Sequence, residues 1–117
     1  MAGLGTFAEL STVSDSSVVK IDDDIPLSRA CLLGCGVTTG WGSAVNTADV
    51  RPGDTVVVIG FGGIGSGAVQ GARLAGAEHI VVVELLESKR ETALRFGATH
   101  FVGTVAEAVE LVGQLTR

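Results

Sequence analysis

The chain has 117 residues, of which 17 are Gly, and 46% of its residues are hydrophobic while 18% are charged. That apolar content excludes a disordered chain, and glycines without a period of three exclude a collagen-like one. The net charge of −5 arises from 13 acidic and 8 basic residues without a basic cluster, which argues against a nucleic-acid or anionic-membrane partner.

The cysteine content and the start of the chain indicate the compartment. Cys31 and Cys35 are too few for a disulfide framework, which predicts a reducing environment. The opening MAGLGTFAEL has no basic or apolar leader pattern, and no stretch reaches the about 18 consecutive apolar residues of a membrane span. We therefore expect a soluble cytoplasmic protein without a membrane partner.

The first part of the chain predicts two strands followed by two short helices. Residues 6–13 alternate loosely and residues 17–21 are β-branched, and both patterns favour strands. Residues 27–48 are small and compatible with helix, but glycines interrupt them. This stretch predicts two helices with a bend near residues 34–36.

From residue 55 onward the pattern alternates between strand and helix. Continuous Val and Ile runs are typical of strands that are buried on both faces. The alternation predicts a parallel sheet with right-handed crossovers. The expected strands cover residues 55–59, 79–84 and 100–102, and the expected helices cover residues 63–75, 87–96 and 105–115.

The domain organisation follows from the number of these units. A doubly wound dinucleotide fold needs two such halves, and this chain has one. The opening strands, about 28 residues, are too few to bury a core. We predict an α/β chain in which residues 29–117 form the first half of a doubly wound parallel Rossmann sheet, preceded by a short β remnant in residues 1–28. The chain is then expected to be a piece of a longer protein that lacks sequence at both ends.

A glycine-rich turn of the form G-x-G-x-x-G follows the first strand of this sheet. Gly60 allows a sharp exit from the strand, Gly62 lets a pyrophosphate approach the backbone, and Gly65 lets the next helix lie close to the sheet. Free backbone N–H groups then face the phosphates at the positive end of the helix dipole. The motif consists of Gly60, Phe61, Gly62, Gly63, Ile64 and Gly65, and the free N–H groups are those of its last three residues.

The helix after this turn carries a face of small residues. Glycines repeat every four positions along it, and alanines widen the face. We expect this face to pack closely against a strand. It consists of Gly63, Gly67, Gly71, Ala68, Ala72 and Ala75.

Glu84 ends the second strand of the unit, 24 positions after Gly60. A carboxylate there accepts hydrogen bonds from the adenosine ribose and repels a 2′-phosphate, which predicts NAD over NADP. Lys89 is expected to reach the same ribose, while Arg90 beside it is a competing cation. The alternatives are a turn without ligand and a solvent-facing Glu84. Flavoproteins also use the motif, usually at the start of the chain.

Several stretches of the chain resemble the zinc-containing alcohol dehydrogenases of the medium-chain dehydrogenase/reductase superfamily. The similarity covers nearly the whole chain. Residues 36–42 and 89–91 are nearest to the actinobacterial branch, which includes enzymes that use N,N-dimethyl-4-nitrosoaniline as an artificial electron acceptor. The main matching stretches are CLLGCGVTTGWG at 31–42, VRPGD at 50–54 and VIGFGGIG at 58–65.

The resemblance implies roles for individual residues. Cys35 falls on the position of a third protein ligand of the catalytic zinc, and Cys31 matches a cysteine that is not a ligand. Thr39 matches a position beside the nicotinamide ring. The other two zinc ligands of the family lie upstream of the first residue here, and His79 and His100 do not replace them.

The resemblance further implies a whole protein that oxidises an alcohol to an aldehyde or ketone with NAD and zinc, as a homo-oligomer, in which residues 1–28 end the catalytic GroES-like domain. One cysteine cannot form a catalytic zinc site, so we expect no dehydrogenase activity from this chain alone and assign it no catalytic residue. Two alternative functions stay open: an inactive nucleotide-binding remnant and a zinc-free reductase of the same superfamily. Cys35 argues against the second, because such a reductase has no need of a thiolate at this position. The expected cofactor-binding residues are Thr39, Gly60, Phe61, Gly62, Gly63, Ile64, Gly65, Glu84 and Lys89, and the expected metal ligand is Cys35.

Overall fold

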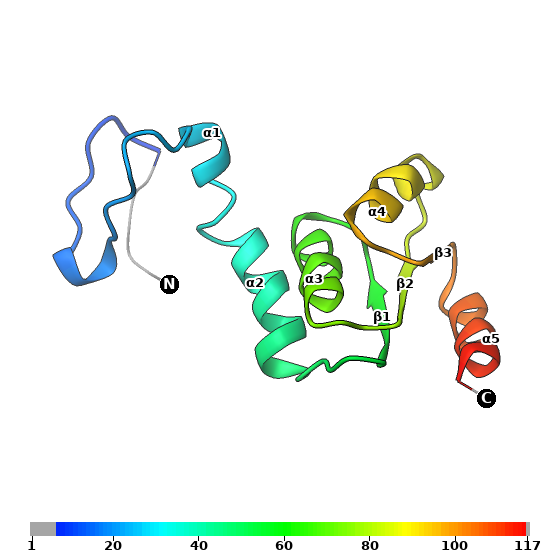
Figure 1. Cartoon of the computed structure of the whole chain (residues 1–117). Coiled ribbons are helices and arrows are strands. Elements are labelled where there is room, and N and C mark those ends of the chain that lie inside the picture. The colour runs from blue at the N-terminus through cyan, green and yellow to red at the C-terminus, as the bar shows by residue number, and fades with distance from the viewer. Residues whose placement is uncertain (1–6, 117) are drawn as a thin grey trace.

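A three-stranded parallel sheet organises the second half of the chain in the computed structural model, which describes residues 7–116 (Figure 1). Strand β1 (Thr55–Ile59) pairs with β2 (His79–Val83), and β2 pairs with β3 (His100–Val102). The pairing is parallel, as the strand–helix alternation predicts, and the spatial order β1-β2-β3 follows the chain. All three strands therefore end at the same edge of the sheet.

Helices cover both faces of this sheet. Helix α3 (Gly63–Leu74) connects β1 to β2, and α4 (Arg90–Phe96) connects β2 to β3 on the same face. Helix α5 (Val105–Leu115) packs on the opposite face, where Ala108 joins Val81 and Val83 in a smaller cluster. These helices confirm the predicted ones, except that α3 ends one residue earlier and the turn η3 (Glu87–Lys89) precedes α4. Within residues 7–116 no helix has the length and apolar character needed to cross a bilayer.

The three strands are not equally buried. Strand β2 is buried on both faces, as predicted, but β1 is not: Val57 is 41% exposed and Ile59 is 70% exposed. The prediction that β1 is buried on both faces is therefore wrong. The physical reason is that β1 forms an edge of the described sheet, so that neighbouring side chains flank it on one side only.

The two strands expected before residue 22 do not form within the described residues. Residues 7–14 adopt no strand, and η1 (Asp15–Ser17) is a single 3-10 turn; Thr6 lies outside the described residues. A strand gains stability from a paired neighbour, and residues 7–35 contain no buried residue that could support one. The radius of gyration is accordingly 17.1 Å, against about 13 Å for a compact domain of about 100 residues.

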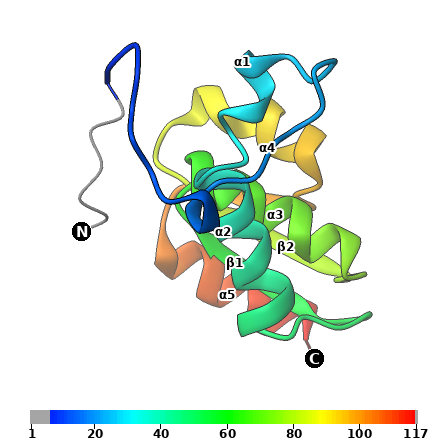
Figure 2. The ribbon, with the colours of Figure 1, turned by 90° about the vertical axis from the view of Figure 1, so that its left-hand side faces the viewer.

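The predicted pair of short helices before the sheet is confirmed. Helix α1 (Leu27–Ala30) and helix α2 (Gly36–Gly42) are separated by a turn over residues 31–35, and a π-turn, η2 (Ser43–Thr47), extends α2. Figure 2 shows α2 lying alongside α3. The two helices therefore form a layered pair on one side of the sheet.

The glycines on the small-residue face of α3 contact α2 rather than a strand, which corrects the expectation from the sequence for them, whereas Ala72 of the same face is buried in the core with the sheet. A Cβ atom added at Gly67 would lie 2.8 Å from the carbonyl oxygen of Val37, and one added at Gly71 would lie 3.0 Å from that of Trp41. The sheet instead receives the larger Val69, which is completely buried. The glycines thus set how closely the two helices approach.

Candidate functional site

The glycine-rich turn leaves β1 through a backbone conformation that favours glycine. Gly60 has φ of +89°, and its N–H donates to the carbonyl oxygen of Val83 at 2.8 Å, the last bond between the two strands. A Cβ atom added at Gly65 would lie only 1.9 Å from the carbonyl oxygen of Gly60. A Cβ atom at Gly62 would meet no atom within 4 Å, so this residue faces open space. The turn therefore folds back tightly on itself and presents its outer side to solvent.

The amides at the start of α3 point out of this turn without partners. Helix α3 begins at Gly63, and no side chain caps its first turn. The first amide with an acceptor is that of Ser66, which donates to the carbonyl oxygen of Gly62 at 2.8 Å. Within residues 7–116 the N–H groups of Gly63, Ile64 and Gly65 have no acceptor. Three donors thus gather at the positive end of a helix dipole, an arrangement suited to an anion.

Glu84 lies against this turn from the end of the neighbouring strand. Its Oε2 atom accepts the Phe61 N–H at 2.9 Å and the Lys89 Nζ at 2.9 Å, while Oε1 accepts the Leu86 N–H at 3.1 Å. The Glu84 side chain is only 11% exposed. The hydrogen bond from Lys89, followed by those from Phe61 and Leu86, lowers the pKa of Glu84 to about 2. The carboxylate is therefore ionised at neutral pH.

The hydrogen bonds of Glu84 leave room for one ligand group. A carboxylate offers about four acceptor sites, and the protein fills two at Oε2 and one at Oε1. Glu84 thus braces the glycine turn and still has one acceptor site at Oε1. This contact with the turn cannot be predicted from the sequence, because the spacing of the residues does not show which amide the carboxylate reaches.

Phe61 takes part in the turn through its backbone alone. Its side chain is 5% exposed and lies in the core, where its ring packs edge-on against Phe96 with 5.9 Å between the centroids. This contact anchors the turn to α4. We therefore assign the Phe61 ring to packing and its N–H to the bond with Glu84.

A crevice of about 410 Å³ opens where the three strands end. It lies between Glu84 and the loop that starts α5, and ligands of open α/β sheets bind at this edge. Its apolar walls include Leu85, which is 85% exposed, and Val105, which is 51% exposed. These two residues cannot be predicted from the sequence, because only the parallel register of β3 brings the residue 103–105 loop beside Glu84. The lining residues are Ile59, Gly60, Val83, Glu84, Leu85, Gly103, Thr104 and Val105.

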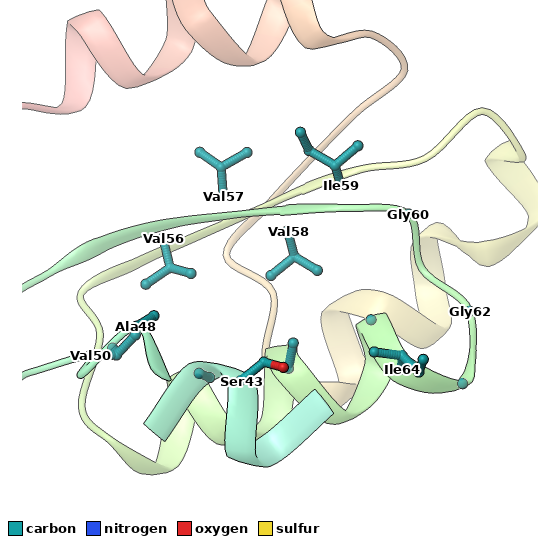
Figure 3. A pocket seen from close by; sticks show the side chains of 14 residues that line it. Ser43, Ala48, Val50, Val56, Val57, Val58, Ile59, Gly60, Gly62 and Ile64 are labelled. Atoms are coloured by element: carbon teal, nitrogen blue, oxygen red, sulfur yellow. The ribbon is translucent and has the colours of Figure 1, made fainter. Parts of the chain in front are cut away.

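A second, apolar pocket of about 610 Å³ runs along the other side of the turn. Figure 3 shows Val56 and Val58 pointing from β1 toward the helical segment that contains Ser43, whereas Val57 and Ile59 point away from it, to the opposite face of the strand. The glycine turn closes one end of this pocket. The turn thus separates a crevice that contains a carboxylate from a pocket that is largely apolar.

Cys35 lies directly before α2 and Thr39 lies within it, on the helix that packs beside the start of α3. Cys35 precedes the helix and is exposed, and a Cβ atom added at the next residue, Gly36, would lie 3.6 Å from the carbonyl carbon of Gly63. Thr39 is also exposed. The structure therefore brings the α2 segment beside the glycine-rich turn.

The described residues do not supply a complete zinc site. Residues 7–116 contain no group of three or more His, Cys, Asp or Glu side chains arranged to hold a metal. A catalytic zinc needs three protein ligands and an open position, and Cys35 could supply only one of them. His79 and His100 stack edge-on at the opposite, starting ends of β2 and β3. This part of the chain alone does not fit the metal.

Arg90 has its hydrogen bonds on the α4 side of β3. Its Nη1 donates to the carbonyl oxygen of Phe101 at 3.1 Å, and its guanidinium lies 4.6 Å from the centroid of the Phe101 ring. Nη2 donates to Glu87 at 3.1 Å, and Nε donates to the same carboxylate. The pair with Glu87 raises the pKa of Arg90. The cation next to Lys89 is therefore engaged in packing.

The fold and the site define the class of this chain: a parallel α/β unit with a glycine-rich turn and an acidic residue at the end of the second strand. The family description "Zinc-binding dehydrogenase" matches residues 63–117. Alcohol dehydrogenase B of Mycobacterium tuberculosis is 53% identical over 99% of this chain and 31% of its own length. The NDMA-dependent alcohol dehydrogenase of Amycolatopsis methanolica shows the same identity and coverage.

Solved structures agree with these relatives. The crystal structure of an alcohol dehydrogenase zinc-binding domain protein from Burkholderia ambifaria has a TM-score of 0.72 and 35% identity, over 80% of this chain and 26% of that one. Residues 63–117 thus match the zinc-binding dehydrogenase family, and the chain is similar over nearly its whole length to alcohol dehydrogenases. It spans about a third of the length of the curated relatives it matches.

Proposed function

We propose that this chain carries an NAD-binding site of an alcohol dehydrogenase. The observation that supports the proposal is the glycine turn itself: it leads into three free amides at the start of α3, and its Phe61 N–H donates to the ionised Glu84, which lines the crevice where the strands end. In α/β folds this motif binds a dinucleotide, with the diphosphate at the glycine turn and the ribose at the acidic residue that ends the second strand. The alcohol or aldehyde substrate and the homo-oligomer of the whole protein belong to the same proposal.

In the proposed complex the cofactor spans the glycine turn, with its diphosphate at the start of α3 and its adenosine at the end of β2. The pyrophosphate accepts from the free amides of Gly63, Ile64 and Gly65, and Gly62 leaves the space for it. The adenosine ribose donates to the remaining acceptor site on Glu84 Oε1, and Lys89 Nζ has further N–H groups for the same sugar. The adenine lies between the apolar side chains of Leu85 and Val105.

The charges around the ribose support NAD over NADP. A 2′-phosphate would approach the Glu84 carboxylate, whose pKa of about 2 keeps it negative at neutral pH. Arg90, which could offset that charge, already bonds to Glu87 and Phe101. Lys89 is then the cation left to offset the repulsion between the 2′-phosphate and Glu84, and its charge is already paired with that same carboxylate.

The nicotinamide end is proposed to lie beside α2. Bound NAD supplies a hydride acceptor for the alcohol carbon. Thr39 and the half-exposed Ile64 border the ring and keep water from it.

Cys35 is proposed as one zinc ligand of the whole protein. Because the described residues do not complete that site, we derive no step through the metal. The chain alone is expected to lack dehydrogenase activity.

Equilibrium binding of NADH and NADPH to the chain tests the proposal. We expect tighter binding of NADH, and we expect Glu84→Gln to narrow the difference between the two ligands because it removes the repulsive charge. Glu78→Gln is the matched control, because Glu78 precedes β2 at the opposite edge of the sheet. Tighter binding of NADPH, or binding of neither nucleotide, would contradict the proposal.

A further inference from the structure

Helices α2 and α3 approach so closely at Gly40 that no other residue fits there. A Cβ atom added at Gly40 would lie 2.0 Å from the carbonyl oxygen of Ile64 and 2.7 Å from the backbone nitrogen of Ala68. Both neighbours are backbone atoms, which cannot rotate away as a side chain end could. Gly40 is also the buried residue of α2. The contact is therefore a fixed backbone-to-backbone spacing.

This contact joins the two ends of the proposed cofactor site. Ile64 belongs to the first turn of α3, and its own N–H is one of the three free amides. Gly40 directly follows Thr39 on α2, the residue proposed to border the nicotinamide. A shift of one helix against the other would thus change the distance between the phosphate-binding amides and the nicotinamide side.

We infer that Gly40 is a positioning residue, which sets the distance between the α2 segment that holds Cys35 and Thr39 and the phosphate-binding turn. The inference rests on the proposed NAD site. Any side chain at position 40 must move from 2.0 Å to the 3.4 Å at which ordinary contact begins. Misplacement of reacting groups by about 1 Å costs on the order of a hundredfold in rate. The spacing therefore determines whether both ends of one cofactor are held at once.

Helix α2, rather than α3, is expected to move when this spacing changes. Helix α3 is fixed to the sheet by Val69 and Ala72, both completely buried. The amides that bind phosphate stay in place as a result. A larger residue at position 40 should consequently affect the nicotinamide end and leave the diphosphate end intact.

Gly40→Ala and Gly42→Ala form a matched pair that tests this. Both lie on α2 and gain the same helix propensity, but a Cβ atom at Gly42 would meet only Asn46 Nδ2, at 3.6 Å. ADP-ribose probes the diphosphate and adenosine end, and NADH adds the nicotinamide. For Gly40→Ala we expect ADP-ribose affinity within about twofold of the original chain and NADH affinity lower by about tenfold or more. Gly42→Ala should bind both ligands like the original chain.

Trp41 gives a readout that does not depend on affinity. It is the single tryptophan of the chain and follows Gly40 on α2, so energy transfer from it to bound reduced nicotinamide reports their distance. The transfer and the ligand-free Trp41 emission should change in Gly40→Ala but not in Gly42→Ala. If Gly40→Ala fails to fold, Gly71→Ala intrudes less on the same interface, at 3.0 Å from the Trp41 carbonyl oxygen, and should show a smaller effect of the same kind.

The outcomes separate this inference from the function on which it rests. Equal losses of ADP-ribose and NADH in Gly40→Ala, equal affinity of the original chain for both ligands, or unchanged Trp41 emission in both variants would overturn the positioning role. Failure of the original chain to bind either ligand would overturn the proposed function, while the ligand-free Trp41 comparison would still decide whether Gly40 sets the spacing.

Discussion

Strands β1 and β2 are alike in sequence but not in surroundings. They read TVVVI and HIVVV and pair residue for residue, yet Ile80 of β2 is 1% exposed whereas Ile59 of β1 is 70% exposed. Strand β2 has a neighbour on each side and helices on both faces, while β1 is a sheet edge. The comparison shows that the burial of a parallel strand depends on its neighbours more than on its own hydrophobicity.

The proposed site combines one element from each strand. The free amides follow the exposed β1, and Glu84 follows the buried β2. The bond from the Phe61 N–H to Glu84 Oε2 connects them at 2.9 Å. The buried strand thus fixes the position of the carboxylate, and the carboxylate in turn fixes the turn that ends the exposed strand.

The largest effect is expected when the same residue type is truncated in the two strands. Ile80→Ala should lower the free energy of unfolding by about 2–5 kcal/mol, because it leaves a cavity in the core. Ile59→Ala should change it by less than about 0.5 kcal/mol, because its side chain is already largely in solvent. Urea unfolding followed by circular dichroism measures both. Equal losses would mean that β1 is buried in solution and that the contrast does not hold.

The next effect separates stability from binding at the glycine turn. Gly65→Ala should destabilise the chain by about 1–3 kcal/mol, because its Cβ would overlap the Gly60 carbonyl oxygen. Gly62→Ala should keep the stability, since its Cβ enters open space, but should weaken ADP-ribose binding by about tenfold or more, because that space is the proposed phosphate position. Unfolding midpoints together with calorimetric titration distinguish the two variants. A Gly62→Ala chain that binds like the original would place the phosphate elsewhere.

The sequence predicts what depends on local pattern and misses what depends on neighbours. The bounds of β1, β3 and α5 follow from apolar runs and turn residues, and the structure confirms them. The strands expected in residues 6–13 and 17–21 have the right local pattern but no partner among the described residues, so they do not form.

The same distinction applies to the site. The G-x-G-x-x-G spacing predicts the free amides, because a helix start always leaves its first N–H groups without helical acceptors. Leu85 and Val105 could not be found in this way, since they meet only through the register of three strands. The packing of Gly67 on α2 was missed for a similar reason: a face of small residues does not reveal which element it contacts.

The pH dependence of stability tests whether the Glu84 carboxylate at the end of the buried strand β2 stabilises the fold. Glu84 has a folded-state pKa of about 2 against an ordinary value of 4.5, so its ionised form stabilises the fold. That stabilisation is fully present above pH 4.5 and is lost as the pH falls toward 2. The original chain should therefore exceed Glu84→Gln in urea midpoint at pH 7, and the difference should shrink through this acidic range. Glu110→Gln, on the exposed side of α5, is the control and should change the midpoint little. A difference that does not vary with pH would show that the three hydrogen bonds do not favour the charged form.

The smallest effect is expected at Lys89, the one partner of Glu84 that a ligand can share. Its Nζ lies 2.9 Å from Glu84 Oε2, and its side chain is 36% exposed, so Lys89→Met should change the unfolding free energy by no more than about 1 kcal/mol. The methionine keeps the length of the stem and removes the donors, so NADH affinity should fall by only a few-fold while Glu84 keeps its bonds to Phe61 and Leu86. Titration of NADH into Lys89→Met and Glu84→Gln ranks the two residues. If Lys89→Met lost more affinity than Glu84→Gln, the lysine rather than the carboxylate would be the main ribose contact, and the preference for NAD would no longer follow from the end of β2.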